Sequence, residues 1–409
     1  MSGAVGTNRR SFVKKATTAG GFQIVAPHVL GGPKYTPPSE TFGAALIGAG
    51  GRGPGTFGDL GRKHKLAIRE IARCDVKWVG RSDNKTRYTD FRRLLERNDL
   101  DVVAIATPPH WHALISIAAM EAGKDVVCEK PMTRFLAEGR AVVEASRRTK
   151  RIFQIGTYGR FGVAGRKNND LRKIVRAGLV NGREVRVVHR GGFKVRQWSG
   201  PVRIKPQTVP DYLDWNMYCG PSPLKPFHPP RFGGMHRGYW DYDGGGLGDM
   251  GQHALDPITY RMGKDETSPV EVTAHAPPAH PEVAGMWGWV RFKYEDGVEL
   301  VLESGEWGDP HGLKEKKISR EDLNEQERKV FDDLPDEDPL VGFGDAVKTR
   351  VLAGGHPEVA HRTVSLMHLA NVAFRTGRTI KFDPKTERAI GDEEANRLID
   401  QPMRAPWHL

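Results

Sequence analysis

The sequence predicts an α/β protein of two domains, a doubly wound parallel sheet followed by a second α/β domain with a large, mostly antiparallel open sheet. Up to residue 156, short apolar runs alternate with amphipathic stretches, which is typical of buried parallel strands joined by helices. Beyond residue 156, runs in which apolar and polar residues alternate are separated by long loops rich in glycine and proline. This second pattern is typical of strands that bury one face and expose the other.

The first domain is expected over residues 41–156. Its predicted strands are residues 42–47, 71–76, 101–107, 125–128 and 152–155. Helices predicted at 112–121 and 136–148 join the later strands, because parallel neighbours need a crossover connection.

The second domain is expected over residues 157–390. Its predicted strands are residues 184–190, 270–275, 286–294 and 298–303. The charged segment 304–337 is expected at the periphery, and the apolar spacing over 358–376 predicts an amphipathic helix. Residues 391–409 are expected to form a C-terminal tail.

The composition is that of an ordinary globular protein. The 409 residues are 38% apolar and 27% charged, and the mean hydropathy is −0.52. No run approaches the roughly 18 apolar residues that a membrane-spanning helix needs, so a membrane span is not expected. The three cysteines, Cys74, Cys128 and Cys219, are scattered and indicate neither a disulfide framework nor a zinc site.

The formal net charge of +12 raises the question of a nucleic-acid partner. Between residues 61 and 97 there are 12 Lys and Arg against 5 acids, so one segment carries over half of the excess. These charges alternate with apolar residues and are not interleaved with stacking aromatics. A solvated face explains this pattern better, and no nucleic-acid partner is expected.

The N-terminus carries the pair Arg9-Arg10, followed by Phe12 and Lys14 and then a weakly apolar run. This arrangement resembles a twin-arginine export signal, so residues 1–40 are expected to be a signal and linker. A periplasmic or exported protein is therefore predicted. The alternative is a basic tail on a cytoplasmic protein.

Residues 48–53, which directly follow the first predicted strand, have the spacing G-x-G-x-x-G. Gly48 would allow the tight turn, Gly50 would let the backbone approach a pyrophosphate, and Gly53 would let the helix pack closely. The second predicted strand leads to Asp75, at the distance expected of an acid that binds a ribose. Together these features predict a dinucleotide site in a Rossmann domain.

Asp75 favours NAD over NADP, because a carboxylate accepts hydrogen bonds from the ribose hydroxyls and repels a 2′-phosphate. The nearby cations Arg73, Lys77 and Arg81 weaken this preference, so NADP stays possible.

Three further motifs accompany the glycine loop: Ala106-Thr107-Pro108 with His112, Glu129-Lys130-Pro131, and the glycine-rich stretch 244–253 that contains Asp249 and His253. With them the chain resembles the Gfo/Idh/MocA oxidoreductases. The resemblance implies a Rossmann domain, a C-terminal α/β domain whose open sheet forms a homo-oligomer, and a sugar, polyol or sugar-derivative substrate between them.

The same resemblance implies Lys130, Asp249 and His253 as catalytic residues. The residues it implies for cofactor binding are Gly48, Gly50, Gly51, Arg52, Gly53, Asp75, Thr107, Pro108, His112, Glu129 and Lys130. The chemistry agrees with this set, because alcohol oxidation needs a base for the hydroxyl proton and a group that stabilises the alkoxide. Asp249 and His253 are four residues apart and share a helix face, where Asp249 is expected to orient substrate and imidazole.

Aromatic faces cover the apolar face of a sugar, so several residues are candidates for the substrate pocket. These candidates are Tyr158, Arg160, Trp215, Tyr239 and Trp240. His110 and His112 do not share a helix face, and no metal site is expected.

Two alternatives to a dehydrogenase stay open. Some members of the family are glycosidases that oxidise and re-reduce the sugar transiently, and these tend to lack the lysine that is present here as Lys130. A non-catalytic dinucleotide-binding regulator would not need Lys130, Asp249 and His253 together.

Overall fold

A computed structural model describes residues 40–164 and 169–409. The predicted export signal lies outside these residues. Within them, no helix is both long and apolar enough to cross a membrane.

The first sheet has six parallel strands in the order β3-β2-β1-β4-β5-β6. Their bounds are β1 Phe42–Ile47, β2 Ile68–Cys74, β3 Arg87–Tyr88, β4 Val102–Ile105, β5 Asp125–Cys128 and β6 Phe153–Ile155. The strand order reverses between β1 and β4, and ligands bind at such a point in doubly wound sheets. The five predicted strands are confirmed, and β3 is an additional edge strand of two residues.

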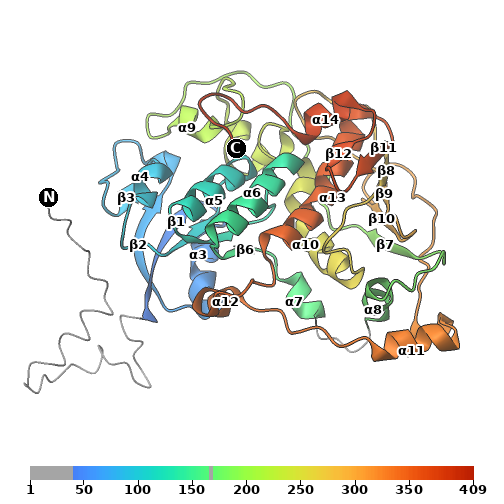
Figure 1. Cartoon of the computed structure of the whole chain (residues 1–409). Helices are drawn as coiled ribbons and strands as arrows, with labels where there is room; N and C mark the ends of the chain where they lie inside the picture. The colour runs from blue at the N-terminus through green and yellow to red at the C-terminus, as the bar shows by residue number, and fades with distance from the viewer. Residues whose placement is uncertain (1–39, 165–168) are drawn as a thin grey trace, which may run out of the picture. The chain divides into compact units, whose positions relative to one another are not determined.

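The helices of this domain are α3 Gly53–Arg62, α4 Phe91–Leu95, α5 His112–Glu121 and α6 Leu136–Thr149. Helices α5 and α6 run side by side across one face of the sheet (Figure 1). Against the other face, Phe343 and Val347 pack with Leu46 and Val102. They belong to α12 Phe343–Thr349, so the chain returns to the first sheet after forming most of the second.

The second sheet also has six strands, in the order β12-β11-β8-β9-β10-β7. Their bounds are β7 Arg186–Arg190, β8 Glu271–His275, β9 Trp289–Lys293, β10 Glu299–Glu303, β11 Ile380–Asp383 and β12 Arg388–Ala389. The pairings along this sheet are antiparallel except β7 with β10, which is parallel. The predicted mostly antiparallel sheet is confirmed.

Two long helices, α10 Gly245–Arg261 and α13 Pro357–Thr376, contact each other, and α13 also packs against α6 of the first domain. The remaining helices are α7 Gly159–Val163, α8 Asp170–Arg176, α9 Trp215–Cys219, α11 Glu325–Asp333 and α14 Glu393–Ile399. Helix α14 was not predicted. It buries Ala395 and Ile399, and beyond it Trp407 packs edge-on against Trp111.

Candidate active site

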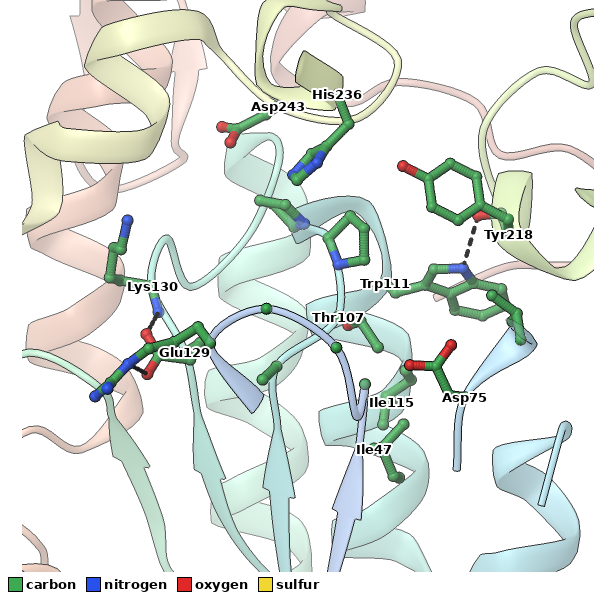
Figure 2. A pocket seen from close by; sticks show the side chains of 18 of the residues that line it. Ile47, Asp75, Thr107, Trp111, Ile115, Glu129, Lys130, Tyr218, His236 and Asp243 are labelled. Atoms are coloured by element: carbon green, nitrogen blue, oxygen red, sulfur yellow. Dashed lines mark hydrogen bonds and ion pairs between the residues drawn. The ribbon is translucent and has the colours of Figure 1, made fainter. Parts of the chain in front are cut away.

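A cleft of about 680 Å³ lies at the carboxyl ends of β1, β4 and β5. The first domain contributes the glycine loop, Thr107, Pro108, Glu129 and Lys130, and the second contributes Asp249 and His253. Figure 2 shows Asp75, Trp111 and Tyr218 toward one end of this cleft, with Lys130 and Asp243 toward the other. Motifs that are far apart in the sequence therefore share one cavity.

Glycine is required at two points of the loop between β1 and α3. Gly48 has φ of +89°, and a Cβ there would lie 2.6 Å from the backbone of Ala106 and Thr107. A Cβ on Gly53 would lie 2.0 Å from the carbonyl oxygen of Gly48. Around Gly51 nothing lies within 4 Å of a Cβ position, so the backbone there faces open space. This open cradle before a helix N-terminus suits a pyrophosphate.

Asp75 follows β2 and is buried at the edge of the cleft. Its Oδ2 accepts a hydrogen bond from the Ala49 amide (2.9 Å), and its Oδ1 accepts one from the Lys77 amide (3.0 Å). The Lys77 ammonium lies 3.9 Å from Oδ2. A carboxylate and a cation thus stand together where the sequence predicts the ribose.

Glu129 ties the strand β5 to the helix α3. Its Oε1 accepts hydrogen bonds from the Thr56 hydroxyl (2.6 Å) and from Nε of Arg52 (3.1 Å). Arg52 also pairs with Asp59 at 2.8 Å. These contacts hold Arg52 at the rim of the cleft beside Lys130.

Lys130 and Asp249 meet although 119 residues separate them in the chain. Nζ of Lys130 donates to Oδ1 of Asp249 (2.7 Å) and to its backbone carbonyl (2.6 Å). Arg237 forms a second ion pair with the same carboxylate at 2.7 Å. Burial would raise the pKa of the Asp249 carboxyl, but Lys130 and Arg237 outweigh it and hold this pKa below its usual range.

His253 lies one helical turn after Asp249 and lines the cleft. In the described residues its imidazole has no hydrogen-bond partner, and Asp249 contacts Lys130 and Arg237 instead. The prediction that Asp249 orients this imidazole is therefore wrong. Burial, and then the positive charge of Lys130, lower the pKa of His253. Its imidazole is neutral at pH 7.

His112 does not line the cleft, which corrects the prediction that it contacts the cofactor. It is 1% exposed, and its ring nitrogens lie 2.6 Å from the Pro131 carbonyl and 2.7 Å from the Thr107 carbonyl. Its imidazole instead joins the two loops that carry Thr107 and Lys130.

Among the predicted substrate residues, only Tyr158 lines the cleft, with its hydroxyl 3.1 Å from Nε2 of His64. Arg160 is 1% exposed and forms an ion pair with Asp256 at 2.7 Å, so its charge is balanced inside the protein and does not face the cleft.

The other aromatic candidates belong to the core. The Tyr239 hydroxyl donates to the Pro201 carbonyl, and the indole of Trp240 donates to the His280 carbonyl. Trp215 is buried in the same apolar cluster as Tyr239. A substrate role for Arg160, Trp215, Tyr239 and Trp240 is wrong, because burial and internal partners remove these side chains from the cleft.

Several residues of the cleft wall were not predicted from the sequence. The cleft-lining residues without an earlier prediction include Trp111, Met217, Tyr218, Phe232, His236, Arg237 and Asp243. Most come from the irregular chain before α10, where no periodicity marks them. An arginine between the glycines of 233–238 was the one available signal, since a charged side chain in a glycine-rich loop next to a catalytic motif has few core roles.

No group of three His, Cys, Asp or Glu residues within 40–164 and 169–409 is arranged to hold a metal ion. A dinucleotide fits the cleft better, because the open backbone at Gly51, the buried Asp75 and the mouth of the parallel sheet are the features that such a cofactor needs.

These features define a dinucleotide-binding Rossmann domain. Residues 42–157 match the oxidoreductase family with an NAD-binding Rossmann fold, and residues 164–409 match the C-terminal α/β domain of the same family. The chain belongs to the Gfo/Idh/MocA oxidoreductase family.

Curated relatives match parts of the chain. A levoglucosan dehydrogenase from Pseudarthrobacter phenanthrenivorans is 49% identical over 57 residues, which is 14% of this chain and 15% of the relative. A glycosyl hydrolase family 109 protein from Shewanella pealeana is 29% identical over 150 residues, or 33% of this chain and 32% of the relative. The chain thus matches about a third or less of the length of these two relatives.

Among solved structures, the WlbA dehydrogenase from Bordetella pertussis, in complex with NADH and UDP-GlcNAcA, has a TM-score of 0.52 with 17% identity. The similarity covers 84% of this chain and 99% of that one. It supports the shared two-domain fold.

Proposed function

We propose that the protein is an NAD(P)-dependent dehydrogenase that oxidises a secondary alcohol of a sugar, polyol or sugar derivative. The observation that carries this proposal is the contact of Lys130 with Asp249 beside His253, within the cleft that holds the glycine loop. Desolvating ions costs free energy, and this charged pair faces the cleft, whereas Arg160 and Asp256 pair inside the core. Its place in the cleft wall favours a role in the chemistry.

The residues divide the chemistry between them. The neutral imidazole of His253 accepts the hydroxyl proton, and Lys130 stabilises the alkoxide that develops. Asp249 holds the Lys130 ammonium in place through two hydrogen bonds. The glycine loop and Asp75 would hold the nicotinamide cofactor, which would supply the hydride acceptor for the reaction.

A screen of hexoses, inositols and disaccharides for reduction of added NAD and NADP tests this proposal. We expect at least one compound to give stoichiometric reduction. Cleavage of a disaccharide without net reduction of the cofactor would instead support the glycosidase. The similarity to a glycosyl hydrolase family 109 protein is the observation that favours this alternative.

Replacing His253 should remove the base. His253→Ala is expected to lower kcat by about 10² or more, and added imidazole should restore part of the loss. Wild-type kcat should fall on acidification only at a pH below the usual pKa of a histidine, because burial and the charge of Lys130 lower the pKa of His253. A pH series of kcat in His253→Ala should lack this acid limb, and the exposed His408→Ala should behave as wild type. If kcat of His253→Ala still falls at acidic pH as in wild type, another residue is the base.

We propose that Asp75 favours NAD and that Lys77 allows NADP to bind as well. Asp75→Ala should weaken NAD binding by about 10- to 100-fold, since a charge-assisted hydrogen bond is lost. Lys77→Ala should weaken NADP binding and leave NAD binding within about twofold. Fluorescence titration with both cofactors measures this, with the exposed Lys85→Ala as control. Equal effects of either variant on the two cofactors would contradict the assignment.

We also propose that the chain is exported by the twin-arginine route and that the second sheet forms a homo-oligomer. The motif Arg9-Arg10 supports the first proposal. A fusion carrying Lys at both positions would stay in the cytoplasm if that route is used.

A further inference from the structure

Asp243 stands in the wall between the cleft and a second, smaller cavity. The second cavity has a volume of about 20 Å³ and is lined by α13, by the end of α14 and by the chain just before α6. Asp243 is the one residue in the described parts of the chain that lines both. Its side chain is 3% exposed, so the two cavities rather than bulk solvent are its surroundings.

On the cleft side, Asp243 lies close to the reaction centre. Its Oδ1 accepts a hydrogen bond from the Gly244 amide at 2.7 Å. A Cβ on Gly248, the residue before Asp249, would lie 2.3 Å from the same oxygen, so the carboxyl packs against the first turn of α10. Figure 2 shows the Asp243 carboxyl at the same end of the cleft as Lys130.

The smaller cavity is polar and large enough for one water molecule, which needs roughly 10 to 15 Å³. Arg134 and Asn371 line it, and each has a buried polar atom without a partner in the described structure, Nε of Arg134 and Oδ1 of Asn371. One atom donates and the other accepts, and a water between them would satisfy both.

Several charged and titratable groups surround Asp243. On the cleft side these are Lys130, His236, Arg237 and Asp249, and on the cavity side they are Arg134, His368 and Arg375. Burial, followed by the negative charge of Asp249, raises the pKa of Asp243 to about 7, against the opposing effects of the Gly244 amide, Arg237 and Lys130. This carboxyl can therefore gain and lose a proton near neutral pH.

We propose that Asp243 is a proton-relay residue, which passes the proton released by alcohol oxidation from the active site to a water molecule in the small cavity behind it. The inference rests on the proposed dehydrogenase function. Each oxidation removes one hydride from carbon and one proton from the hydroxyl oxygen. While substrate fills the cleft, the proton accepted by His253 needs a second way out. The carboxylate of Asp243, which lines the cleft together with His253, would accept this proton and give it to the cavity water. From there the proton would reach solvent past Gln401, a partly exposed residue of the cavity wall.

Two variants test the relay from its two sides. Asp243→Asn keeps the shape but cannot exchange a proton, and Val372→Leu fills the small cavity from α13 without touching the cleft. Stopped-flow traces of cofactor reduction and of proton release to an indicator dye should coincide in wild type. In both variants we expect proton release to slow by about 10² at an unchanged KM, the lower end of general acid–base effects. Asp241→Asn, whose carboxylate pairs with Lys225 and Arg231, is the matched control.

Wild-type proton release in Asp243→Asn would overturn the relay. If proton release slows in Asp243→Asn but keeps its wild-type rate in a folded Val372→Leu, the route through the small cavity is wrong.

A measurement without substrate separates this inference from the proposed function. A carboxyl whose pKa is higher in the folded than in the unfolded protein stabilises the fold at low pH and loses that contribution as the pH rises through the folded pKa. The Tm of Asp243→Asn should therefore rise relative to wild type between pH 6 and pH 8. A difference in Tm that is independent of pH in this range would refute proton exchange at Asp243 even if no substrate is found.

Discussion

Lys130→Met is expected to bind the cofactor normally and to lose turnover. The side chain lies 2.7 Å from Asp249 and does not form the glycine loop, so the change removes a cation at the alkoxide and leaves the dinucleotide cradle intact. Loss of one electrostatic stabiliser typically lowers kcat by about 10² to 10³, or roughly 3 to 4 kcal/mol. Single-turnover reduction with prebound cofactor measures the effect.

Lys124→Met is the matched control, because it removes a buried lysine whose ammonium donates to the carbonyls of Arg97 and Leu100 away from the cleft. Each variant loses two hydrogen bonds of a lysine ammonium, so the rates should be compared at a temperature where both proteins are folded. Wild-type single-turnover rates in Lys130→Met would remove this lysine from the mechanism.

Gly50→Val is expected to abolish cofactor binding while the protein still folds. A Cβ at Gly50 would come within 2.6 Å of only the Lys77 ammonium, which is the mobile end of a long side chain. The protein can accommodate the change, but the added methyl groups would occupy the space that the pyrophosphate needs. Cofactor content after purification and calorimetric titration with NAD measure the loss.

Gly61→Val is the matched control. It adds the same side chain near the end of α3, the helix that follows the loop of Gly50, and the nearest neighbour of its Cβ is 3.9 Å away. Normal cofactor content in a folded Gly50→Val would contradict the placement of the pyrophosphate at this loop.

The first sheet was predictable because its strands are continuous apolar runs, and a buried parallel strand leaves little other choice of residues. Strand β3 was not predicted, because two residues carry no period. The direction of β7 could not be predicted from the sequence either. Alternation of apolar and polar residues identifies a strand but does not show which strand it pairs with. Its parallel pairing with β10 depends on a chain path of more than a hundred residues.

The site was predictable where its residues follow strands, as Asp75 and Lys130 do, because the topology brings such ends together. The Arg237 contact with Asp249 was not predictable, since it depends on the fold of an irregular loop. The aromatic candidates Tyr239 and Trp240 failed for a general reason: a large aromatic side chain is more often core than ligand contact, and sequence alone does not separate the two.

Transfer of deuterium from substrate to cofactor distinguishes a dehydrogenase from a glycosidase. The test uses a sugar or polyol found in the screen, labelled with deuterium on the carbon that bears the oxidised hydroxyl. We expect one deuterium in each reduced nicotinamide and one ketone formed per cofactor reduced, with both signals lost in Lys130→Met. A cleaved sugar with the deuterium still on carbon or returned to it, and with no net reduced cofactor, would contradict a dehydrogenase.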